Sequence, residues 1–205
     1  MTIEQCQNHA IPRDLTSYPI VYQEKLWEVL NNIEVKDAHG ELLPLEQAVI
    51  EIVDKMKTLK EKENKVIFIG NGGSAGIASH QAIDFWKNGE IPSINFNDAS
   101  LLTCLSNDYG YEFVFEKPIK TFAKKGDILI AISSSGKSEN ILKAVLAAKE
   151  KDLFIITMSG FSKTNPLRAL GDINFYVPST VYGHVEIAHL IVSHTILDTH
   201  MDTKL

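Results

Sequence analysis

The sequence predicts an α/β protein, in which a doubly wound, mostly parallel sheet of five strands is flanked by helices and preceded by further N-terminal helices. Short apolar runs rich in Val and Ile recur after residue 65, and segments of helical length alternate with them. The runs do not alternate apolar with polar residues, so both faces of their sheet should be covered. Strands that alternate with helices form βαβ units and hence a parallel sheet.

The expected elements follow from these runs in chain order. Strands are expected at 66–70, 91–96, 128–133, 154–160 and 173–177, of which 91–96 has the weakest pattern. Helices are expected at 74–86, 100–105 with its continuation, 138–151 and 185–201. Ligands of doubly wound sheets bind beyond the carboxyl ends of the strands. The residues that follow each strand are therefore candidates for a functional site.

Residues 1–64 are expected to form an N-terminal arm and helices, and residues 65–205 the sheet domain. The arm ends near Pro12, and apolar residues at helical spacing predict helices over 18–33 and 45–62. A single small sheet domain offers no obvious cover for the apolar stripe of this helical part. We therefore expect it to pack against a partner subunit, so that the protein is not a monomer.

The composition excludes several functional classes. The chain has 205 residues, of which 44% are hydrophobic and 22% charged, as in one compact globular domain. No apolar run approaches the roughly 18 residues of a membrane span, and the start lacks the pattern of a secretory signal. Two distant cysteines and a net charge of −6 argue against a disulfide framework and against nucleic-acid binding. We expect a cytoplasmic protein without a nucleic-acid or membrane partner.

A glycine-rich turn follows the first strand of the sheet domain. Its residues, 70–74, read Gly-Asn-Gly-Gly-Ser and precede a helix. Three glycines within four residues allow a tight turn and a close approach of the backbone to a ligand. Ser74 can cap the helix, whose free N–H groups attract an anion. A plain strand-to-helix turn is the alternative interpretation.

A serine-rich turn follows the strand at 128–133 and also opens a helix. Ser133, Ser134, Ser135 and Ser138 surround a single glycine. Four hydroxyls exceed what a helix cap requires, and hydroxyls with backbone N–H groups at a helix N-terminus suit a phosphate monoester. The spacing differs from that of a P-loop. The turn predicts a phosphate site, with a polar capped turn as the alternative.

Two helices carry residues that suit a metal ion. His80 and Asp84 are four residues apart and hence share one face of the first helix of the domain. Glu186 and His194 lie eight residues apart on the final helix, about 80° around its axis. Two imidazoles and two carboxylates suit zinc if the two helices meet. Separate surface histidines are the alternative.

These motifs together resemble a known family. GNGGSA at 70–75, NDYGYE at 107–112, ISSSGKS at 132–138 and the histidine-bearing final helix resemble the SIS domain, and within it the phosphoheptose isomerases. The resemblance covers about residues 66–198. It implies the isomerisation of sedoheptulose 7-phosphate to a heptose 7-phosphate by proton transfer through an enediol or enediolate, in a homotetramer.

The resemblance also implies roles for individual residues. It implies zinc ligands at His80, Asp84, Glu186 and His194, with Asp84 and His194 as the proton-transfer pair. It implies a phosphate site at Ser133, Ser134, Ser135 and Ser138, and a sugar pocket that includes Asn71, Gly72, Gly73, Ser74, Asn97, Asp98 and Glu186. His189 matches a family histidine and is interpreted either as structural or as a residue that supports the metal ligands without binding the metal.

The sequence departs from the family at several of these positions. Asp84 stands where a glutamate is usual, and Glu186 replaces a glutamine. An isomerase of another sugar phosphate is therefore one alternative. A non-catalytic SIS protein that binds a sugar phosphate or a protein partner is another. All four proposed metal positions hold residues that can bind a metal, which favours the enzyme.

Overall fold

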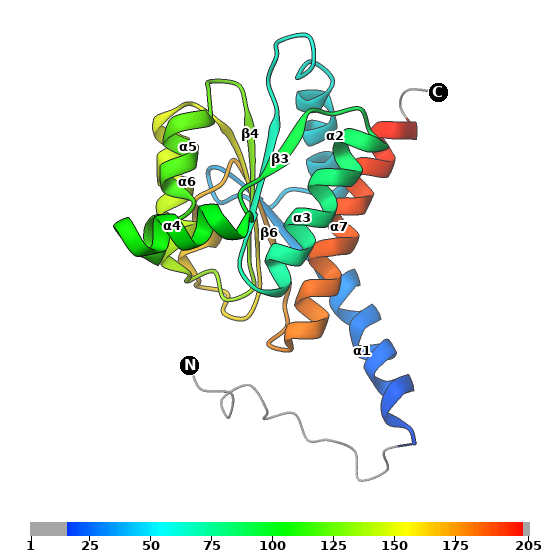
Figure 1. Cartoon of the computed structure of the whole chain (residues 1–205). Helices are drawn as coiled ribbons and strands as arrows, with labels where there is room; N and C mark the ends of the chain where they lie inside the picture. Colours follow the sequence, from blue (N-terminus) through cyan, green and yellow to red (C-terminus); the bar gives the residue numbers. More distant parts are fainter. Residues whose placement is uncertain (1–15, 203–205) are drawn as a thin grey trace.

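The computed structural model describes residues 16–202 and confirms the predicted α/β architecture. A six-stranded sheet, with the strand order β1-β6-β5-β4-β2-β3, lies between two layers of helices (Figure 1). The predicted N-terminal arm ending near Pro12 lies outside the described residues. None of the described helices is both long enough and apolar enough to cross a bilayer.

Five strands of the sheet are parallel, as the sequence predicts. They are β2 (Val66–Gly70), β3 (Ser93–Asn95), β4 (Ile128–Ser133), β5 (Phe154–Ser159) and β6 (Ile173–Tyr176). The sixth, β1 (Glu34–Asp37), pairs antiparallel with β6 at the edge of the sheet, so the expected number of five strands was wrong. Only Val35 of its four residues is apolar, and no hydrophobic run marks the strand in the sequence.

The helices cover the two faces of the sheet in separate groups. One face carries α2 (Leu45–Met56), α3 (Gly73–Lys87) and α7 (Tyr182–Asp202), whereas α1 (Tyr18–Asn31) contacts α7 and extends away from the sheet (Figure 1). The other face carries α4 (Ala99–Tyr109), α5 (Glu116–Phe122) and α6 (Glu139–Glu150). Two short 3-10 helices, Tyr111–Phe113 and Pro166–Ala169, lie in the connections.

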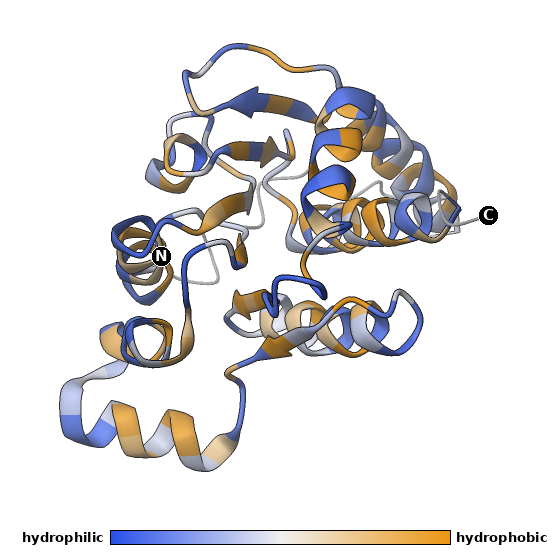
Figure 2. Ribbon diagram, turned by 90° about the horizontal axis from the view of Figure 1, so that it is seen from above, coloured by the Kyte–Doolittle hydropathy of each residue, from blue (hydrophilic) through white to orange (hydrophobic). Residues whose placement is uncertain are grey.

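Each face of the sheet has its own hydrophobic core. Successive side chains of a strand point to opposite faces, so Phe68 enters the core under α2, α3 and α7, while Ile67 enters the core under α5 and α6. Figure 2 shows hydrophobic residues gathered on the sides of the helices that face the strands. Val35 of β1 and Ile52 of α2 belong to the first core. The predicted division into residues 1–64 and 65–205 stays a prediction. Val35 and Ile52 come from the first part but belong to the same core as the strands of the second.

A buried histidine ties α7 to the carboxyl end of β5. His189 is fully buried, and its Nε2 lies 3.2 Å from the carbonyl oxygen of Ser159, the last residue of the strand. Burial lowers the pKa of His189 from 6.5 to about 4 and outweighs this hydrogen bond, which favours the charged form. The ring is therefore neutral near pH 7, and its N–H donates to the strand end, in keeping with the structural role expected for it.

Acidification should destabilise the fold through His189. Between pH 6.5 and pH 4 the unfolded chain binds a proton at this residue and the folded chain does not, so stability falls as the pH falls. The difference in pKa corresponds to about 3 kcal/mol at the acid end of this window. Urea unfolding from pH 7 to pH 4 measures it. The variant His189→Gln should lose less stability on acidification than the wild type, whereas His39→Gln, at an exposed histidine, should follow the wild type. Parallel pH curves for wild type and His189→Gln would contradict the assignment.

Candidate active site

The glycine turn and the serine turn lie side by side because they follow adjacent parallel strands. β2 and β4 are paired in register, so both turns open at the same edge of the sheet. The side-chain amides of Asn71 and Asn140 join them, each donating to the oxygen of the other over 2.9 Å. Tyr111 donates its hydroxyl to the same Asn71 oxygen, also over 2.9 Å. Asn71 is thus held by two segments that are distant from it in the sequence.

A cavity of about 240 Å³ lies between the two turns. Two of its lining residues, Tyr182 and Glu186, come from α7, so three segments meet around it. The cavity is lined by Asn71, Gly72, Gly73, Ser74, Ile132, Ser133, Ser134, Ser135, Ser138, Tyr182 and Glu186. This set contains all the residues predicted to bind substrate except Asn97 and Asp98, and the binding role itself stays a prediction.

The serine turn contains a buried hydroxyl that no described residue satisfies. The Ser134 hydroxyl is buried and has no hydrogen-bond partner among the described residues. Ser138 is the N-cap residue of α6 but its side chain accepts no capping hydrogen bond, and instead its Oγ lies 3.3 Å from that of Ser133. A buried hydroxyl without a partner costs free energy unless a ligand satisfies it. This orphaned hydroxyl, at the N-terminus of a helix, supports an anion site.

Glu186 occupies the N-terminus of the other helix. Its carboxylate lies against Gly73, the first residue of α3, so closely that any side chain at position 73 would collide with it. A negative charge is favourable at a helix N-terminus. Glu186 therefore offsets the positive end of α3, while the N-terminus of α6 remains open to a ligand.

Helices α3 and α7 are in contact, as the predicted metal site requires. His80 and Asp84 of α3 and His194 of α7 offer ligand atoms that all lie within 4.8 Å of one another. His80 Nε2 is 3.0 Å from Asp84 Oδ2, and the rings of His80 and His194 are 5.5 Å apart between centroids. Two imidazoles and one carboxylate form a donor set that fits a catalytic zinc ion. Glu186, the fourth predicted ligand, is not a member of this group.

Gln81 belongs to the same cluster and was missed by the sequence analysis. Its side chain is fully buried, and its Nε2 lies 3.0 Å from His194 Nε2. Its Oε1 is buried and has no hydrogen-bond partner among residues 16–202. Helical spacing places residue 81 about 100° from His80, and only the packing of α7 brings it to His194.

Asn97 and Asp98 support the site from outside the cavity. The Asn97 amide donates to the carbonyl oxygen of Ala75 over 3.0 Å and to the Ser79 hydroxyl over 2.8 Å, which fixes the first turns of α3. The Asp98 carboxylate caps α4 by accepting from the backbone N–H of Leu101 over 3.0 Å. Their predicted role in the sugar pocket is untested.

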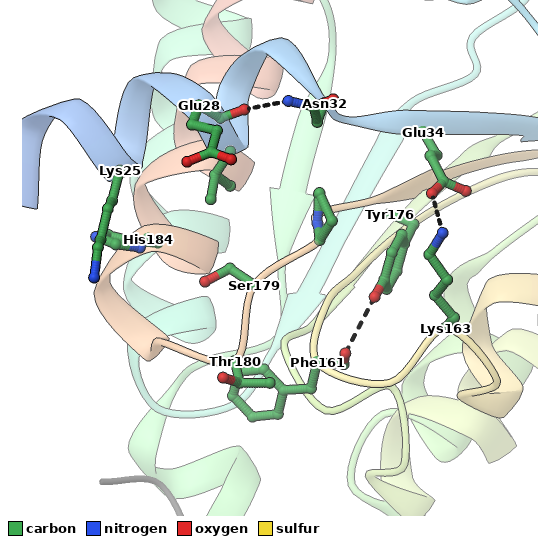
Figure 3. A pocket seen from close by; sticks show the side chains of 12 residues that line it. Lys25, Glu28, Asn32, Glu34, Phe161, Lys163, Tyr176, Ser179, Thr180 and His184 are labelled. Carbon is green, nitrogen blue, oxygen red and sulfur yellow. Dashed lines mark hydrogen bonds and ion pairs between the residues drawn. The ribbon is translucent and has the colours of Figure 1, made fainter. Parts of the chain in front are cut away.

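A larger pocket, of about 770 Å³, lies between α1 and the loop after β6 (Figure 3). Lys25 and Glu28 of α1 line one side of it, and Glu34 and Lys163 lie on the other. Glu34 forms ion pairs with Lys163 and with Arg168, and the hydrogen bond from Lys163 is the main cause that lowers the pKa of its carboxyl. Because the charges of Glu34 and Lys163 are compensated, the smaller cavity with its orphaned hydroxyl is the better candidate site.

Comparisons with known proteins agree with the motifs. Residues 22–160 match the model of the SIS domain family. The chain is 35% identical over 158 residues to a phosphoheptose isomerase of Cytophaga hutchinsonii (74% of this chain, 82% of the relative). It is 39% identical over 150 residues to one of Colwellia psychrerythraea (69% and 76%).

Solved structures agree as well. The phosphoheptose isomerase of Neisseria gonorrhoeae superposes with a TM-score of 0.79 at 27% identity and covers 91% of this chain and 99% of its own. That of Francisella tularensis gives a TM-score of 0.77 at 25% identity, with 93% and 99% covered.

The glycine turn should tolerate no side chain at its first position. A Cβ at Gly70 would lie 2.5 Å from the backbone oxygen of Ser74, whereas one at Gly76 would meet nothing within 4 Å. We expect Gly70→Ala to destabilise the protein by about 1–3 kcal/mol and Gly76→Ala to stabilise it by about 0.5–1 kcal/mol.

Urea unfolding measures both effects. Thermal unfolding with added inorganic phosphate then reports on the cavity: the ligand should raise the melting temperature of the wild type and of Gly76→Ala, but less that of Gly70→Ala. Equal stability and equal phosphate response in the two variants would refute the described turn.

Proposed function

The chain belongs to the phosphoheptose isomerases of the SIS-domain family, and we propose that it interconverts sedoheptulose 7-phosphate and a heptose 7-phosphate. It is a sugar-phosphate isomerase. The observation that carries the specific reaction is the arrangement of two sites along α3 and α7, with an anion cavity at one end and an Asp–His cluster further on.

The phosphate end of the substrate binds in the serine turn. The four predicted serines line the cavity, and the unpartnered hydroxyl of Ser134 supplies a donor that a phosphate oxygen satisfies. The open N-terminus of α6 adds backbone N–H groups. Because the Glu186 carboxylate lies at the N-terminus of α3, its charge repels a phosphate from that side and directs it to the serines.

The length of the site supports a long sugar. Ser74 lines the cavity, and His80 follows it by six residues, which is about 9 Å along a helix axis. A sugar phosphate in its open form, with the phosphate in the cavity, has to span this distance to bring its carbonyl carbon to the cluster. An extended seven-carbon chain with the phosphate on its last carbon is long enough to span this separation.

The reacting end of the sugar lies at Asp84 and His194. Isomerisation moves a proton between two adjacent carbons, which requires a base at one carbon and an acid at the oxygens. We assign this proton transfer to Asp84 and His194, with His80 holding the Asp84 carboxylate in place over 3.0 Å. Zinc, the cofactor expected here, would be held by His80, Asp84 and His194 and would supply polarisation of the carbonyl oxygen.

The protein is proposed to act in the cytoplasm as a homotetramer or dimer. None of the residues of α1 is buried, and the side chains of Ile20 and Trp27 are 58% and 67% exposed. Large apolar side chains on an unburied helix support packing against a partner subunit.

Turnover and site variants test the isomerase. Purified protein should convert sedoheptulose 7-phosphate, with slower turnover of five- and six-carbon ketose phosphates.

Asp84→Asn and His194→Asn should lower kcat by about 10²–10⁴-fold. Ser134→Ala should instead raise KM by about tenfold, because a hydrogen bond to a charged group is lost. Ser100→Ala, at an exposed serine outside the cavity, is the matched control.

Two results would change the proposal. Activity on a hexulose phosphate alone would assign another substrate. Sugar-phosphate binding without turnover of any substrate would indicate a non-catalytic binding protein.

Charge on the exposed face of α1 should disrupt the oligomer. Sedimentation velocity at micromolar concentration should show a dimer or tetramer for the wild type and smaller species for the double variant Ile20→Glu, Trp27→Glu, because an ionised carboxylate is costly to bury. Leu146→Glu, at a half-exposed leucine of α6, should leave the oligomer intact. A monomeric wild type would contradict the proposed interface.

A further inference from the structure

The serine turn is supported from behind by residues 160–168, the segment that follows β5. The backbone N–H of Gly160 donates to the carbonyl oxygen of Ser134 over 3.0 Å. The backbone N–H of Leu167 donates to the carbonyl oxygen of Gly136 over 3.2 Å. The position of the turn therefore depends on how this supporting segment is folded.

Asn165 holds the supporting segment together. Its side chain is buried, and its Nδ2 donates to the carbonyl oxygens of Gly160 and Ser162 over 3.2 and 2.8 Å. The same nitrogen lies 3.2 Å from the Ser159 hydroxyl oxygen at the end of β5. The Asn165 Oδ1 accepts from the backbone N–H of Arg168 over 3.1 Å and so caps the 3-10 helix that follows. One carboxamide thus joins the beginning of the segment to its end.

Asn165 also packs directly against the serine turn. A Cβ added at Gly136 would collide with the carboxamide of Asn165. The φ angle of Gly136 is +61°, in the left-handed region that glycine adopts without strain. The turn therefore curves over the Asn165 side chain. Asn165 itself is not among the residues that line the cavity, whereas the four serines of the turn are.

The supporting segment is anchored to the far edge of the sheet. Tyr176 of β6 donates its hydroxyl to the carbonyl oxygen of Phe161 over 3.1 Å (Figure 3). Arg168 forms an ion pair with Glu34 of β1, and its guanidinium lies 4.2 Å from the centre of the Tyr176 ring. Leu167 is buried in the core under α5 and α6. Asn165 thus lies between a fixed part of the fold and the serine turn.

We propose that Asn165 is a positioning residue of the phosphate site, which acts through the serine turn and does not touch the substrate. The proposal rests on the phosphate site proposed above. Donors bind an anion best when their positions are fixed before the ligand arrives. Gly160 holds the backbone of Ser134, whose buried hydroxyl no described residue satisfies. Loss of the Asn165 bonds would therefore displace this donor from the phosphate.

A second buried asparagine provides the matched control. Asn174 is 2% exposed, and Asn165 is 3% exposed. The Asn174 Oδ1 accepts from the Thr157 hydroxyl over 2.7 Å and from the backbone N–H of Gly171 over 2.8 Å. These bonds join β5 and β6 below the site and do not involve the serine turn. Asn174→Ala therefore removes a comparable buried network and leaves the phosphate site in place.

Steady-state kinetics with sedoheptulose 7-phosphate, combined with urea unfolding of the same proteins, tests the proposal. Asn165→Ala should raise KM about 10–100-fold, because the donors of the turn are misplaced. Its kcat should change less than about threefold, since the phosphate is remote from the reacting carbons. Asn174→Ala should keep KM and kcat within about twofold of the wild type. Both variants should lower the urea midpoint, so stability alone does not produce the difference in KM.

Two further variants separate support of the turn from capping of the 3-10 helix. Asn165→Ser keeps an oxygen that can cap the helix but lacks the amide donor. It should raise KM as Asn165→Ala does, with a smaller loss of stability, and it decides the matter if Asn165→Ala does not fold. Gly136→Ala should also raise KM. This effect should shrink in the Asn165→Ala background, where the new methyl group meets no carboxamide.

The outcomes distinguish the role of Asn165 from the proposed function. Wild-type turnover together with an unchanged KM in the folded Asn165 variants would refute the positioning role alone. An equal rise of KM in Asn174→Ala would refute it as well, because the effect would then follow from stability. Wild-type protein that neither turns over sedoheptulose 7-phosphate nor binds inorganic phosphate in a calorimetric titration would overturn both proposals.

Discussion

The contact between α3 and α7 on one face of the sheet is the constraint on which the candidate site depends. Two glycines mark how close the helices approach. A side chain at Gly73, which begins α3, would collide with Glu186, and one at Gly89, just beyond its end, would collide with Leu197. α7 is thus fitted along the whole of α3, and residues 113 positions apart in the sequence, Gln81 and His194, come into contact. A Cβ at Gly89 would also lie 2.8 Å from the backbone oxygen of Phe85, whereas at Gly73 it would meet only the end of the Glu186 side chain, which can move aside.

The same packing divides the charges of the site. Two helix N-termini open at the carboxyl ends of the adjacent strands β2 and β4, and each would attract an anion. Glu186 reaches the N-terminus of α3 from α7, whereas the N-terminus of α6 meets only the hydroxyls of the serine turn. Negative charge therefore lies on the α3 side of the cavity and hydroxyl donors on the α6 side, and in the proposed binding mode a phosphate at the serines leaves the rest of the sugar toward α3 and α7. The cavity lining contains no basic side chain, so in the proposed binding mode the Glu186 carboxylate orients the substrate.

The sequence predicts the features that are local or periodic and misses those that arise only from tertiary packing. The buried strands β2, β4, β5 and β6 are mostly apolar, and His80 and Asp84 share a face by helical spacing alone. The edge strand β1 could not be found, because it is held by its pairing with β6 and has one apolar residue. The hydrogen bond from Tyr111 to Asn71, the position of Glu186 against Gly73 and the burial of Gln81 all depend on contacts between distant segments. Spacing assigns each of these residues to a face of its own element but cannot say what covers that face.

Buried polar groups around α7 differ in how well they are satisfied, and His189 bonds through Nε2 while its Nδ1 has no partner among the described residues. The Ser193 hydroxyl donates to the carbonyl oxygen of His189 over 2.9 Å, and His189 itself donates to β5. These bonds stabilise α7 whether or not a ligand is bound. The Gln81 and Ser134 oxygens have no such partner among the described residues, and each leaves a desolvation cost of about 1–3 kcal/mol in the unliganded fold. Apolar residues would avoid both costs, so stability alone does not explain a polar group at either position. Ser134 lies in the serine turn and Gln81 beside the His–Asp cluster, so the two unsatisfied oxygens lie at the two ends of the candidate site.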